Sequence, residues 1–459
     1  MAANYVLKKF EEDPEYTKKC VMAPTPQNME VSYSPFEPPY GDVKQFFYNF
    51  FTPYIQPYEY TGWRDEQLSW EKTVYIHAGL SCAPYFRFQG PDALKFLMKH
   101  CTNSFANYKT GTGKHVLTCN EEGQLTSHGM MFKLADDCYD TYFMLSLAGY
   151  YQMEAEEYDM TCIDMTGKKF LFQIGGPRSL ELLEKVTGEN LHDIKFMSFR
   201  NTSICGKEVR IARMGMAGTL AYELHGDTKD AYELYDTIYR AGEEFGIRRL
   251  GWHTYMMEHT ICGYPQTSYH FTCDIPGYPD NTGNVSGSVG KKASGYTDPY
   301  SLGWGFCVKF DHDFVGRKAL EKIKENRKRK MVSLVWNHED ILKVHASQFT
   351  DNPYCPIDEP NDLAKDYRVA IHQDKVLDAE GNVIGVSSGR MMSLYYHEMV
   401  SQCQLDLEFC EEGTEVYVLW GEPDTNQIKI RAAVSRFPYY NENPNNKLDV
   451  ENIPYYNEK

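Results

Sequence analysis

The sequence has no long apolar run and no leader-like start. Among its 459 residues, no stretch approaches the roughly 18 consecutive apolar residues that a membrane-spanning helix needs. The charged first residues are not followed by the apolar segment of a secretory signal. We therefore expect a protein that has no membrane partner and that works in the cytoplasm.

Cysteine is plentiful but forms no recognisable pattern. The 13 cysteines are odd in number and scattered, and no two are spaced as Cys-x-x-Cys. The spacing argues against a zinc ribbon and a thioredoxin motif, and it favours free thiols in a reducing compartment. A His-Glu-x-x-His segment is also absent, so no metal site is predicted.

Basic residues are outnumbered by acidic ones. The sequence has 47 Lys and Arg residues against 64 Asp and Glu residues, which gives a formal net charge of −17. An acidic protein repels phosphate backbones, so nucleic acid is not an expected partner. Nucleotide motifs are missing too, because residues 111–115 (GTGKH) lack the spacing of a phosphate-binding loop. We interpret that stretch as a turn before a strand.

The length and the patterning that are present indicate several globular units. At about 150 residues per domain, the chain corresponds to about three domains. Residues 1–60 are rich in Pro, Tyr and Phe and show weak periodicity, which predicts an irregular arm. After about residue 330 the pattern changes to short strands and turns, which predicts a separate small β-barrel or sandwich.

Local signals predict where several elements begin and end. Pro91 suits the first turn of a helix, and residues 121–123 (EEG) suit the turn of a β-hairpin. Gly188 and Gly246 follow helical patterns and predict the helix C-terminal ends. Asp313 is expected to cap the helix that follows it.

Aromatic residues are the unusual feature of the composition, with 35 Tyr, 24 Phe and 6 Trp. A cluster near the end of the arm includes Tyr58 and Tyr60. These rings could line a pocket for a flat ligand, or they could form part of an aromatic core. The residues alone leave both alternatives open.

One segment carries a chemical signal beyond packing. Residues 213–224 (RMGMAGTLAYEL) place a glycine-containing turn before a strand that bears a single carboxylate, Glu223. The neighbouring residues are largely apolar, so Glu223 is expected to be buried. A buried carboxylate is costly unless it is paired or hydrogen-bonded. Either a structural partner or a ligand with N–H groups would satisfy it.

This segment resembles the folate-binding strand of the glycine cleavage T-protein (aminomethyltransferase) superfamily. Further segments resemble that superfamily in the expected order, from about Tyr60 to Tyr440. They are residues 172–183 (FQIGGPRSLELL), 300–320 (YSLGWGFCVKFDHDFVGRKAL), 376–389 (VLDAEGNVIGVSSG) and 431–440 (RAAVSRFPYY). Within the superfamily, residues 62–70, 90–97, 128–137, 213–218, 308–320 and 416–422 are most similar to the tetrahydrofolate-dependent O-demethylases of vanillate, 3-O-methylgallate and syringate.

The resemblance implies both a fold and a reaction. The implied fold class is α+β, with two interwoven α+β lobes over residues 61–330 around a central channel and a C-terminal β-barrel over residues 331–459. Residues 1–60 would then form an arm that reaches the substrate side. The implied reaction moves a methyl group from a small methoxy-aromatic donor to N5 of the cofactor tetrahydrofolate. The alternatives are another folate-dependent one-carbon transfer, from an N-methyl, S-methyl or aminomethyl donor, and a folate-binding protein without catalysis.

The resemblance also assigns site residues, one position at a time. Tyr255 falls on the active-site tyrosine of the demethylases, and Glu223 falls on the glutamate that binds the pterin N–H groups. Tyr264 stands where those enzymes have a tryptophan in the folate pocket. Tyr222, Arg213 and Gln173 complete the predicted cofactor site. The candidates on the substrate side are His77, Cys82, Tyr58, Tyr60 and His259.

The sequence departs from the family pattern on the substrate side. The catalytic aspartate of the T-protein falls at residues 77–78, where no acid is present, which argues against an aminomethyltransferase. Both polar residues of the demethylases' Gln-x-x-His run are lost at residues 79–82. Their arginine for the substrate carboxylate falls at about Leu145. We therefore expect neutral methoxyarenes to be preferred over vanillate, unless His77 or Arg87 replaces the missing cation.

Overall fold

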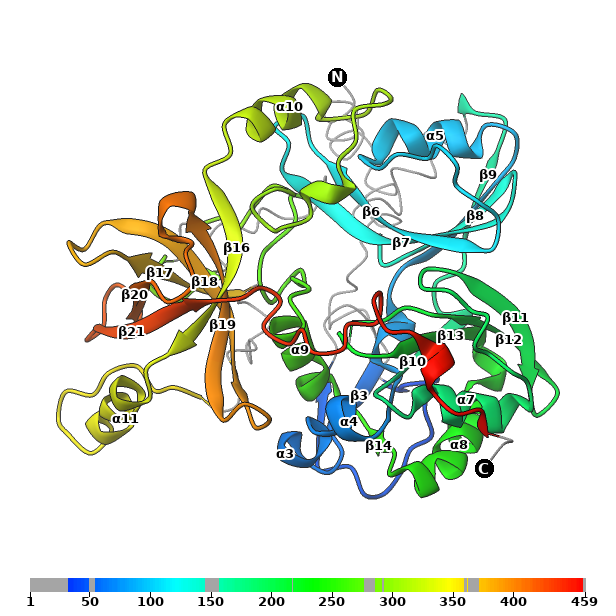
Figure 1. The fold of residues 1–459 in the computed structure, drawn as a ribbon, viewed down its shortest axis with the longest axis horizontal. Coiled ribbons are helices and arrows are strands. Elements are labelled where there is room, and N and C mark those ends of the chain that lie inside the picture. Colours follow the sequence, from blue (N-terminus) through cyan, green and yellow to red (C-terminus); the bar gives the residue numbers. More distant parts are fainter. Residues whose placement is uncertain are drawn as a thin grey trace.

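The computed structural model describes residues 32–48, 54–144, 157–216, 218–275, 285–290, 293–358, 361 and 371–456. Most of the predicted arm and Leu145 lie outside the described residues. The described chain forms two sheet-based lobes and a barrel, with helix α9 (Trp252–Ile261) between them (Figure 1). This arrangement confirms the predicted α+β fold class with a C-terminal barrel.

The first lobe contains a six-stranded sheet of order β11-β12-β13-β10-β4-β14. Its strands, in that order, are β11 (Phe199–Ile204), β12 (Lys207–Ala212), β13 (Ala221–Asp227), β10 (Lys169–Gly175), β4 (Tyr75–His77) and β14 (Arg248–Arg249). Helices α7 (Ser179–Thr187) and α8 (Ala231–Gly242) pack on one face of this sheet. The short helices α3 (Trp63–Glu66) and α4 (Ser69–Lys72) precede it in the chain.

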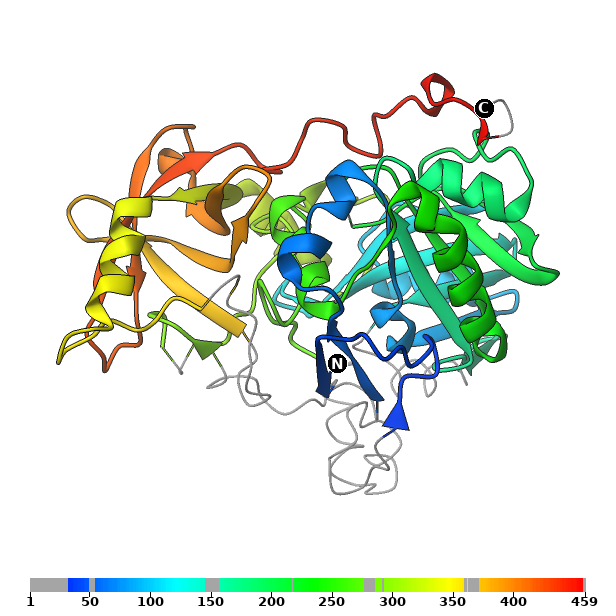
Figure 2. The ribbon, with the colours of Figure 1, turned by 90° about the horizontal axis from the view of Figure 1, so that it is seen from below.

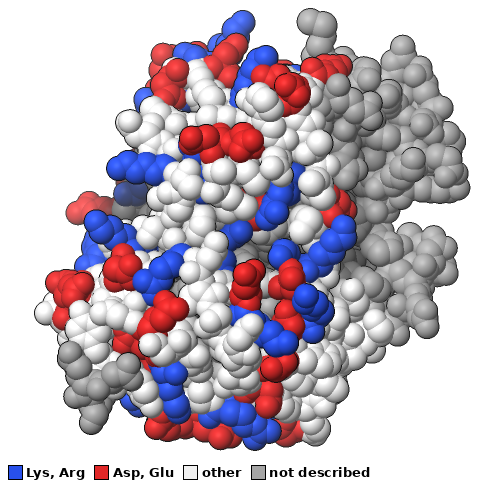
Figure 3. All heavy atoms as spheres, turned by 90° about the vertical axis from the view of Figure 1, so that its right-hand side faces the viewer, with Lys and Arg blue, Asp and Glu red and all other residues white. Residues whose placement is uncertain are grey.

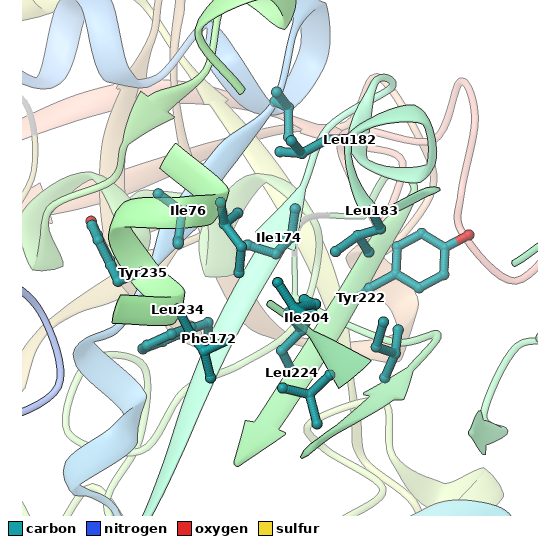
Figure 4. Packing of buried hydrophobic residues seen from close by; sticks show 14 of the residues in the cluster. Ile76, Phe172, Ile174, Leu182, Leu183, Ile204, Tyr222, Leu224, Leu234 and Tyr235 are labelled. Atoms are coloured by element: carbon teal, nitrogen blue, oxygen red, sulfur yellow. The ribbon is translucent and has the colours of Figure 1, made fainter. Parts of the chain in front are cut away.

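Alternation along the strands gives this sheet two different faces. Figure 4 shows Phe172, Ile174 and Leu224 packed with apolar side chains of α7 and α8 in one hydrophobic core. Successive side chains of a strand point to opposite faces. The residues between them, such as Gln173 and Glu223, therefore face away from the two helices toward the centre of the molecule.

The second lobe contains a five-stranded sheet of order β6-β7-β8-β5-β9. Its strands, in that order, are β6 (Thr112–Cys119), β7 (Leu125–Ala135), β8 (Cys138–Tyr142), β5 (Tyr85–Gln89) and β9 (Thr161–Asp164). The β6–β7 hairpin turns at Gly123, whose φ is +80°, so the predicted hairpin is confirmed. Helix α5 (Ala93–His100) confirms the helix predicted here, but its N-cap is Asp92, so Pro91 lies just before the helix and not in its first turn.

The C-terminal sheet closes into a barrel. Its six strands are β17 (Ile371–Leu377), β18 (Val383–Ser393), β19 (Glu398–Asp406), β16 (Arg329–Trp336), β21 (Ile428–Ser435) and β20 (Glu415–Trp420). Pairing between β17 and β20 completes the ring, and β15 (Val285–Ser286) adds to β17. Helix α11 (His338–Ser347) follows β16. The sequence pattern was compatible with either a β-barrel or a β-sandwich, and the closed ring of strands identifies a barrel.

The chain leaves the barrel after β21 and returns to the first lobe. Residues 436–456, called the C-terminal segment below, run across the molecule toward α7 and α8 (Figure 2). The backbone N–H of Tyr440 donates to the Ile261 carbonyl at 2.8 Å, and that of Tyr456 donates to Glu184 at 3.0 Å. The segment therefore ties the barrel to the lobe that carries Glu223.

The described part of the arm packs against α9. Strands β1 (Ser32–Tyr33), β3 (Tyr54–Glu59) and β2 (Gln45–Tyr48) form a small sheet. The ring of Tyr58 stacks on His253 of α9, with centroids 4.4 Å apart. A side chain at Gly251 would collide with the Tyr58 carbonyl, so only glycine permits this close approach.

The predicted helix ends are confirmed at two glycines and wrong at one aspartate. Gly188 and Gly246 have φ values of +69° and +72°, which is the left-handed conformation common at helix ends. Gly188 ends α7, and Gly246 ends the 3₁₀ turn (Glu243–Phe245) that directly follows α8. Helix α10 (Arg317–Glu325) instead begins after Gly316, whose φ is +85°. Asp313 therefore lies too far upstream to cap it.

The surface mixes charges of both signs. On the face shown in Figure 3, acidic and basic side chains alternate without a continuous basic area. None of the helices in the described part of the chain has the length and apolar character that crossing a bilayer requires. Within the same residues, no group of three His, Cys, Asp or Glu side chains could hold a metal ion.

Candidate functional site

Strand register brings three predicted residues into one row. In the antiparallel pairs of β10 with its two neighbours, Gln173 lies opposite both Glu223 of β13 and His77 of β4. Directly opposite residues of a sheet have Cβ atoms about 5 Å apart on the same face. The row therefore faces the centre of the molecule, away from α7 and α8.

Two adjoining spaces lie in front of this row. The outer cavity has a volume of about 540 Å³ and includes the exposed residues Phe306 and Lys309 at its mouth. The inner chamber offers about 30 Å³ and contains the side chain of Tyr255 in its wall. The residues that line both spaces are Met130, Met216, Glu223 and Tyr264. Glu223 thus stands where the two spaces meet.

Glu223 is a buried carboxylate with an unsatisfied oxygen. The residue is 4% exposed, and its Oε2 atom has no hydrogen-bond partner among the described residues. The nearest cation candidate is His225, whose Nε2 lies 3.6 Å from Oε2. Burial lowers the pKa of His225, which keeps the imidazole neutral. The carboxylate is therefore suited to accept N–H groups from a ligand.

The glycine turn before β13 serves close packing. A Cβ atom at Gly215 would lie 2.6 Å from the Ala221 side chain and 3.3 Å from Nε2 of Gln173. At Gly218, where φ is +68°, a Cβ atom would lie 2.6 Å from the sulfur of Cys262. The turn therefore brings the backbone against both the sheet and the end of α9, and Gly215 itself lines the outer cavity.

Tyr255 presents a hydroxyl without a partner to the inner chamber. The side chain is fully buried on α9, and its Oη has no hydrogen-bond partner among the described residues. Its ring stacks on His77 with centroids 4.0 Å apart and an interplanar angle of 7°. Burial, with the nearby acids Glu258 and Glu223, raises the pKa of Tyr255 well above 10. The hydroxyl therefore remains protonated and can donate a hydrogen bond.

Neighbouring histidines are neutral and fixed in orientation. Nδ1 of His77 lies 2.9 Å from the Leu250 carbonyl, and Nδ1 of His259 lies 3.0 Å from the Tyr264 carbonyl. These contacts require the proton on Nδ1, which leaves Nε2 as an acceptor in both rings. Burial lowers the pKa of His77 to about 3 and that of His259 to about 4. Neither ring can supply a positive charge at neutral pH.

Sequence reasoning missed an aromatic group around Tyr264. The rings of His115 and Trp304 lie 5.2 and 5.5 Å from that of Tyr264, and His128 lies 4.8 Å from Trp304. His115 of β6 lies opposite Met130 and His128 of β7 lies opposite Leu117, so the two histidines are diagonal neighbours, with Nε2 and Nδ1 3.4 Å apart. Their positions on the two strands of the predicted hairpin were the available signal.

Two predicted cofactor residues have packing roles in the structure. Tyr222 points to the opposite face of β13 from Glu223 and lies in the core beneath α7 and α8 (Figure 4). The guanidinium of Arg213 donates to the Asn445 and Leu448 carbonyls at 2.9 and 2.7 Å. Arg213 therefore holds the C-terminal segment, and alternation along the strand separates Tyr222 from both cavities.

Three predicted substrate residues also lie outside the lining of the two cavities. Tyr60 is buried and donates its hydroxyl to Glu37. Tyr58 stacks on His253 of α9, as described above. The thiol of Cys82 lies 3.1 Å from the Gly79 carbonyl in the turn after β4. The structure thus brings Tyr255, Glu223 and Tyr264 together at the cavities, with His77, His259 and Gln173 directly behind them.

Comparisons with known proteins identify the relatives of this chain. The GCVT N-terminal domain family matches residues 47–268. The chain is 39% identical over 425 residues to the sesamin methylene transferase of Sinomonas sp. (strain No.22), covering 87% of this chain and 93% of that protein. It is 28% identical over 425 residues to the syringate O-demethylase of Sphingobium sp. (strain NBRC 103272 / SYK-6), covering 83% and 89%.

The fold has a counterpart among solved structures. The crystal structure of glycine cleavage system aminomethyltransferase T from Bartonella henselae superimposes with a TM-score of 0.66 and 18% sequence identity. The match covers 88% of this chain and 96% of that one, so the lobes and the barrel are shared. Because the 39% identity to sesamin methylene transferase extends over most of both chains, this chain is an enzyme of the glycine cleavage T-protein (aminomethyltransferase) superfamily, with O-demethylases among its relatives.

Proposed function

We propose that this enzyme transfers a one-carbon unit from a neutral aromatic ether to tetrahydrofolate. The supporting observation is the unsatisfied, buried carboxylate of Glu223 at the junction of the two spaces. The pterin ring of a reduced folate carries N–H groups that such a carboxylate can accept. Bound tetrahydrofolate would supply the nucleophilic nitrogen N5, to which the carbon is transferred.

The outer cavity fits a ligand of this size and character. Its volume of about 540 Å³ falls within the range of about 300–1,000 Å³ that is typical of small-molecule sites. Tyr264 and His115 supply aromatic walls, and Met130, Met214 and Met216 supply flexible apolar ones. Glu223 is the single acidic residue of the described lining, so it would fix the orientation of the pterin.

Tyr255 is the residue proposed to act on the leaving oxygen. When a C–O bond of an aryl ether breaks, the oxygen gains negative charge. A neutral hydroxyl in a buried chamber can stabilise that charge by donating a hydrogen bond. Because burial raises the pKa of Tyr255, donation of a hydrogen bond is favoured over complete loss of the proton. The stack on His77 holds the ring in place.

The charges around the inner chamber favour a neutral donor. Its described lining contains no Lys or Arg, and His77 beside it is neutral. Arg87 cannot replace the missing cation, because its guanidinium makes hydrogen bonds of 2.7 and 3.1 Å to Asp140. A donor with a carboxylate would therefore bury an unpaired charge, which is strongly unfavourable.

Two kinds of aromatic ether fit the proposal. The relative with 39% identity is named for methylene transfer from sesamin, and the relative with 28% identity is named for demethylation of syringate. Methyl transfer breaks one C–O bond and leaves a phenol. Methylene transfer breaks both C–O bonds of a methylenedioxy ring. The carbon would then form two C–N bonds, to N5 and N10 of tetrahydrofolate, and the protons displaced from these nitrogens would pass to the two oxygens of the catechol product. The higher identity favours a methylenedioxyarene as the donor to test first.

The chamber also limits how the donor enters. Its free space of about 30 Å³ is comparable to one water molecule or one small carbon group. A whole aromatic ring therefore requires movement of the lining. Met130 and Met216 line both spaces, and unbranched methionine side chains change rotamer readily. We propose that these two side chains make room for the ring.

The test combines turnover with folate binding. The purified protein is incubated with tetrahydrofolate and a methylenedioxybenzene, a methoxyphenol, vanillate or syringate. Phenol or catechol release and the folate products are followed by mass spectrometry. We expect turnover of the neutral ethers and little turnover of the two acids. Folate binding without consumption of any donor would instead indicate a binding protein without catalysis.

Glu223→Gln tests the folate site itself. Loss of one charge-assisted interaction in a buried site costs about 1.5–3 kcal/mol, so tetrahydrofolate should bind about ten- to a hundredfold more weakly by calorimetry. Glu208→Gln, at an exposed position of the neighbouring strand β12, is the matched control and should bind like the parent. Equal affinities in parent and Glu223→Gln would place the folate elsewhere.

A further inference from the structure

We infer that His128 is a specificity-determining residue that contacts a second oxygen of the donor, so that the site selects arenes with two adjacent oxygen substituents. The inference rests on the proposed function and extends it, because it names the feature by which the inner chamber recognises an aromatic ether. It follows from the polar atoms in the wall of that chamber that have no partner.

Three side-chain atoms in the described lining of the inner chamber are polar, buried and without a hydrogen-bond partner among the described residues. They are Oε2 of Glu223, Oη of Tyr255 and Nε2 of His128. The proposed function assigns Glu223 to the folate and Tyr255 to the leaving oxygen. Nε2 of His128 is left without a role. A buried polar atom without a partner is unfavourable, so a ligand atom that pairs with it strengthens binding.

His128 reaches the chamber from a different part of the fold than Tyr255. It is on β7 of the second lobe and is 3% exposed, whereas Tyr255 is on α9. Its imidazole packs among three aromatic rings, with centroids 4.8–5.8 Å away, which belong to Trp304, Phe143 and Phe271. The free space of the chamber is only about 30 Å³. Groups in its wall therefore lie close to the same part of a ligand.

The imidazole of His128 is neutral. Burial, with His115 and His259 nearby, lowers the pKa of His128 well below 6.5. A neutral imidazole has one N–H donor and one acceptor nitrogen. Nδ1 of His128 lies 3.4 Å from Nε2 of His115, and the proton of this contact belongs to one of the two rings. That choice decides whether Nε2 of His128 is a donor or an acceptor.

The thiol of Cys307 permits either arrangement. Its sulfur lies 3.8 Å from Nδ1 of His115 and 3.8 Å from the carbonyl oxygen of the same residue. When the thiol donates to Nδ1, His115 donates from Nε2 to His128, and Nε2 of His128 carries a proton. When the thiol donates to the carbonyl, Nδ1 of His115 donates to the sulfur, His128 donates to His115, and Nε2 of His128 is an acceptor. Both arrangements contain the same number of protons, so a ligand can select either one.

The two arrangements match the two kinds of ether in the proposed function. A methylenedioxyarene has two ether oxygens on neighbouring ring carbons, and a 2-methoxyphenol has an ether oxygen beside a hydroxyl. In both, Tyr255 can donate to the ether oxygen whose C–O bond breaks. Nε2 of His128 can donate to the second ether oxygen or accept the O–H of the phenol. An arene whose ether oxygen has no oxygen beside it leaves Nε2 unpaired, so the site should disfavour it.

His128 also has a role when the second C–O bond of a methylenedioxy ring breaks. The two protons of the catechol product still come from N5 and N10 of tetrahydrofolate, so His128 neither gains nor loses a proton overall. Its contribution is a hydrogen bond to the second oxygen while negative charge develops there.

The experiment compares isomers that differ only in the position of the second oxygen. Steady-state kinetics gives kcat/KM for 2-methoxyphenol and for 4-methoxyphenol in the presence of tetrahydrofolate. The parent should prefer the 2-isomer about tenfold, which is the effect of one buried hydrogen bond. Calorimetry without folate gives the affinities for catechol and for resorcinol, in which the two hydroxyls are not adjacent. The parent should prefer catechol by a similar factor.

Two variants of His128 separate its two nitrogens. The amide of asparagine lies near the position of Nδ1, so His128→Asn can keep the contact with His115 but does not reach the chamber. Both preferences should then fall to about twofold or less. The longer amide of His128→Gln reaches the position of Nε2 and can donate or accept there, so most of both preferences should remain. His372→Asn, at a partly exposed histidine of the barrel strand β17, is the control and should behave like the parent.

The ratios do not depend on how much of a variant is folded, so a partial folding defect in His128→Asn leaves the test intact. Equal kcat/KM values for the two methoxyphenols in the parent, equal affinities for catechol and resorcinol, or unchanged preferences in His128→Asn would overturn the inference. If the catechol preference depends on His128 but the parent consumes no ether, the proposed function fails while recognition of adjacent oxygens by His128 stands.

Discussion

Burial determines which protons the side chains of the site retain. It lowers the pKa of the histidines around Tyr255 and raises the pKa of Tyr255 and Glu258. Both effects favour the neutral form of the group. The result is a set of neutral donors and acceptors around Glu223, the single Asp or Glu of the described lining of the inner chamber. This environment suits charge that develops only as a bond breaks.

Tyr255→Phe tests the role of the hydroxyl. The change keeps the ring and its stack on His77, so folate affinity should change little. Loss of one preorganised donor to a developing oxyanion typically lowers kcat about 10²–10³-fold. Steady-state kinetics with the best neutral ether gives the value. Tyr142→Phe is the matched comparison, because that hydroxyl lines the same chamber but already donates to the Leu80 carbonyl. A kcat within threefold of the parent in Tyr255→Phe would show that the hydroxyl is dispensable.

His115 should make stability depend on pH. Burial lowers its pKa to about 3, against about 6.5 in the unfolded chain. The unfolded state therefore binds more protons below pH 6.5, and the native state loses about 1.4 kcal/mol of stability for each pH unit of further decrease. In His115→Gln this loss is absent. Urea unfolding at pH 6.5 and 5.5 gives the free energy of unfolding of both proteins. Between these two pH values, the free energy of unfolding of the parent should fall by about 1 kcal/mol relative to that of the variant. A difference between the two proteins that is the same at both pH values would contradict the lowered pKa of His115.

At the scale of elements, helix α9 is held at both ends by other parts of the chain. At its N-terminal end, the backbone N–H of Gly251 donates to Glu66 of α3 at 2.8 Å. Near its C-terminal end, the Thr260 hydroxyl donates to the Gly389 carbonyl of the barrel at 2.6 Å, and Gln402 donates to the His259 carbonyl at 2.6 Å. These bonds explain how Tyr255 is kept in position between the lobes and the barrel.

The C-terminal segment is an element whose contribution to the site can be tested. Arg213 holds it by two hydrogen bonds to backbone carbonyls, and Asn446 within it lines the outer cavity. Arg213→Met should destabilise the protein by about 3 kcal/mol and weaken folate binding several-fold, because hydrogen bonds to a buried charged group contribute about 1.5–3 kcal/mol each. Urea unfolding and calorimetry measure the two effects.

Limited proteolysis locates the change in this variant. Cleavage within residues 436–456 should be faster in Arg213→Met, since the segment is then less firmly held. Arg200→Met, at a partly exposed arginine of the same lobe that pairs with Asp193, is the control. If the segment is cut at the same rate in all three proteins, its attachment does not depend on Arg213.

At the scale of the whole molecule, the charge near the outer cavity differs from that of the chain. The protein has a net charge of −17, yet Lys114 and Lys309 line the cavity. Neither forms an ion pair with a carboxylate in the described part of the chain. A folate carries a glutamyl tail with negative charge, and cations at the mouth of a cavity attract such a group through the solvent.

The double variant Lys114→Ala/Lys309→Ala should bind tetrahydrofolate several-fold more weakly at low salt. The difference from the parent should shrink at high salt, because screening weakens interactions between exposed charges. Calorimetry at two ionic strengths gives both values. Lys318→Ala, at an exposed position of α10, is the control. An equal salt dependence in the parent and the double variant would show that the tail does not meet these lysines.

Local sequence signals predicted the features that depend on neighbouring residues. Glycines in the left-handed conformation ended two helices, and a glycine turn marked the β6–β7 hairpin. The segments that resemble the T-protein superfamily identified the fold class, and they pointed to Glu223, Tyr255 and Tyr264, which line the cavities. A short segment can carry such information because turns, helix ends and the side chains of one strand are properties of a few consecutive residues.

Only the tertiary structure decided which distant residues meet. Tyr75 and Glu258 are 183 positions apart in the chain, and Arg213 contacts a carbonyl 235 positions away. Strand register placed Gln173 opposite Glu223 and turned Tyr222 to the other face. Such pairings depend on how the sheets, the helices and the C-terminal segment pack together. Burial in that packing then determines the protonation state of each titratable group. No local pattern contains this information, because it arises between segments.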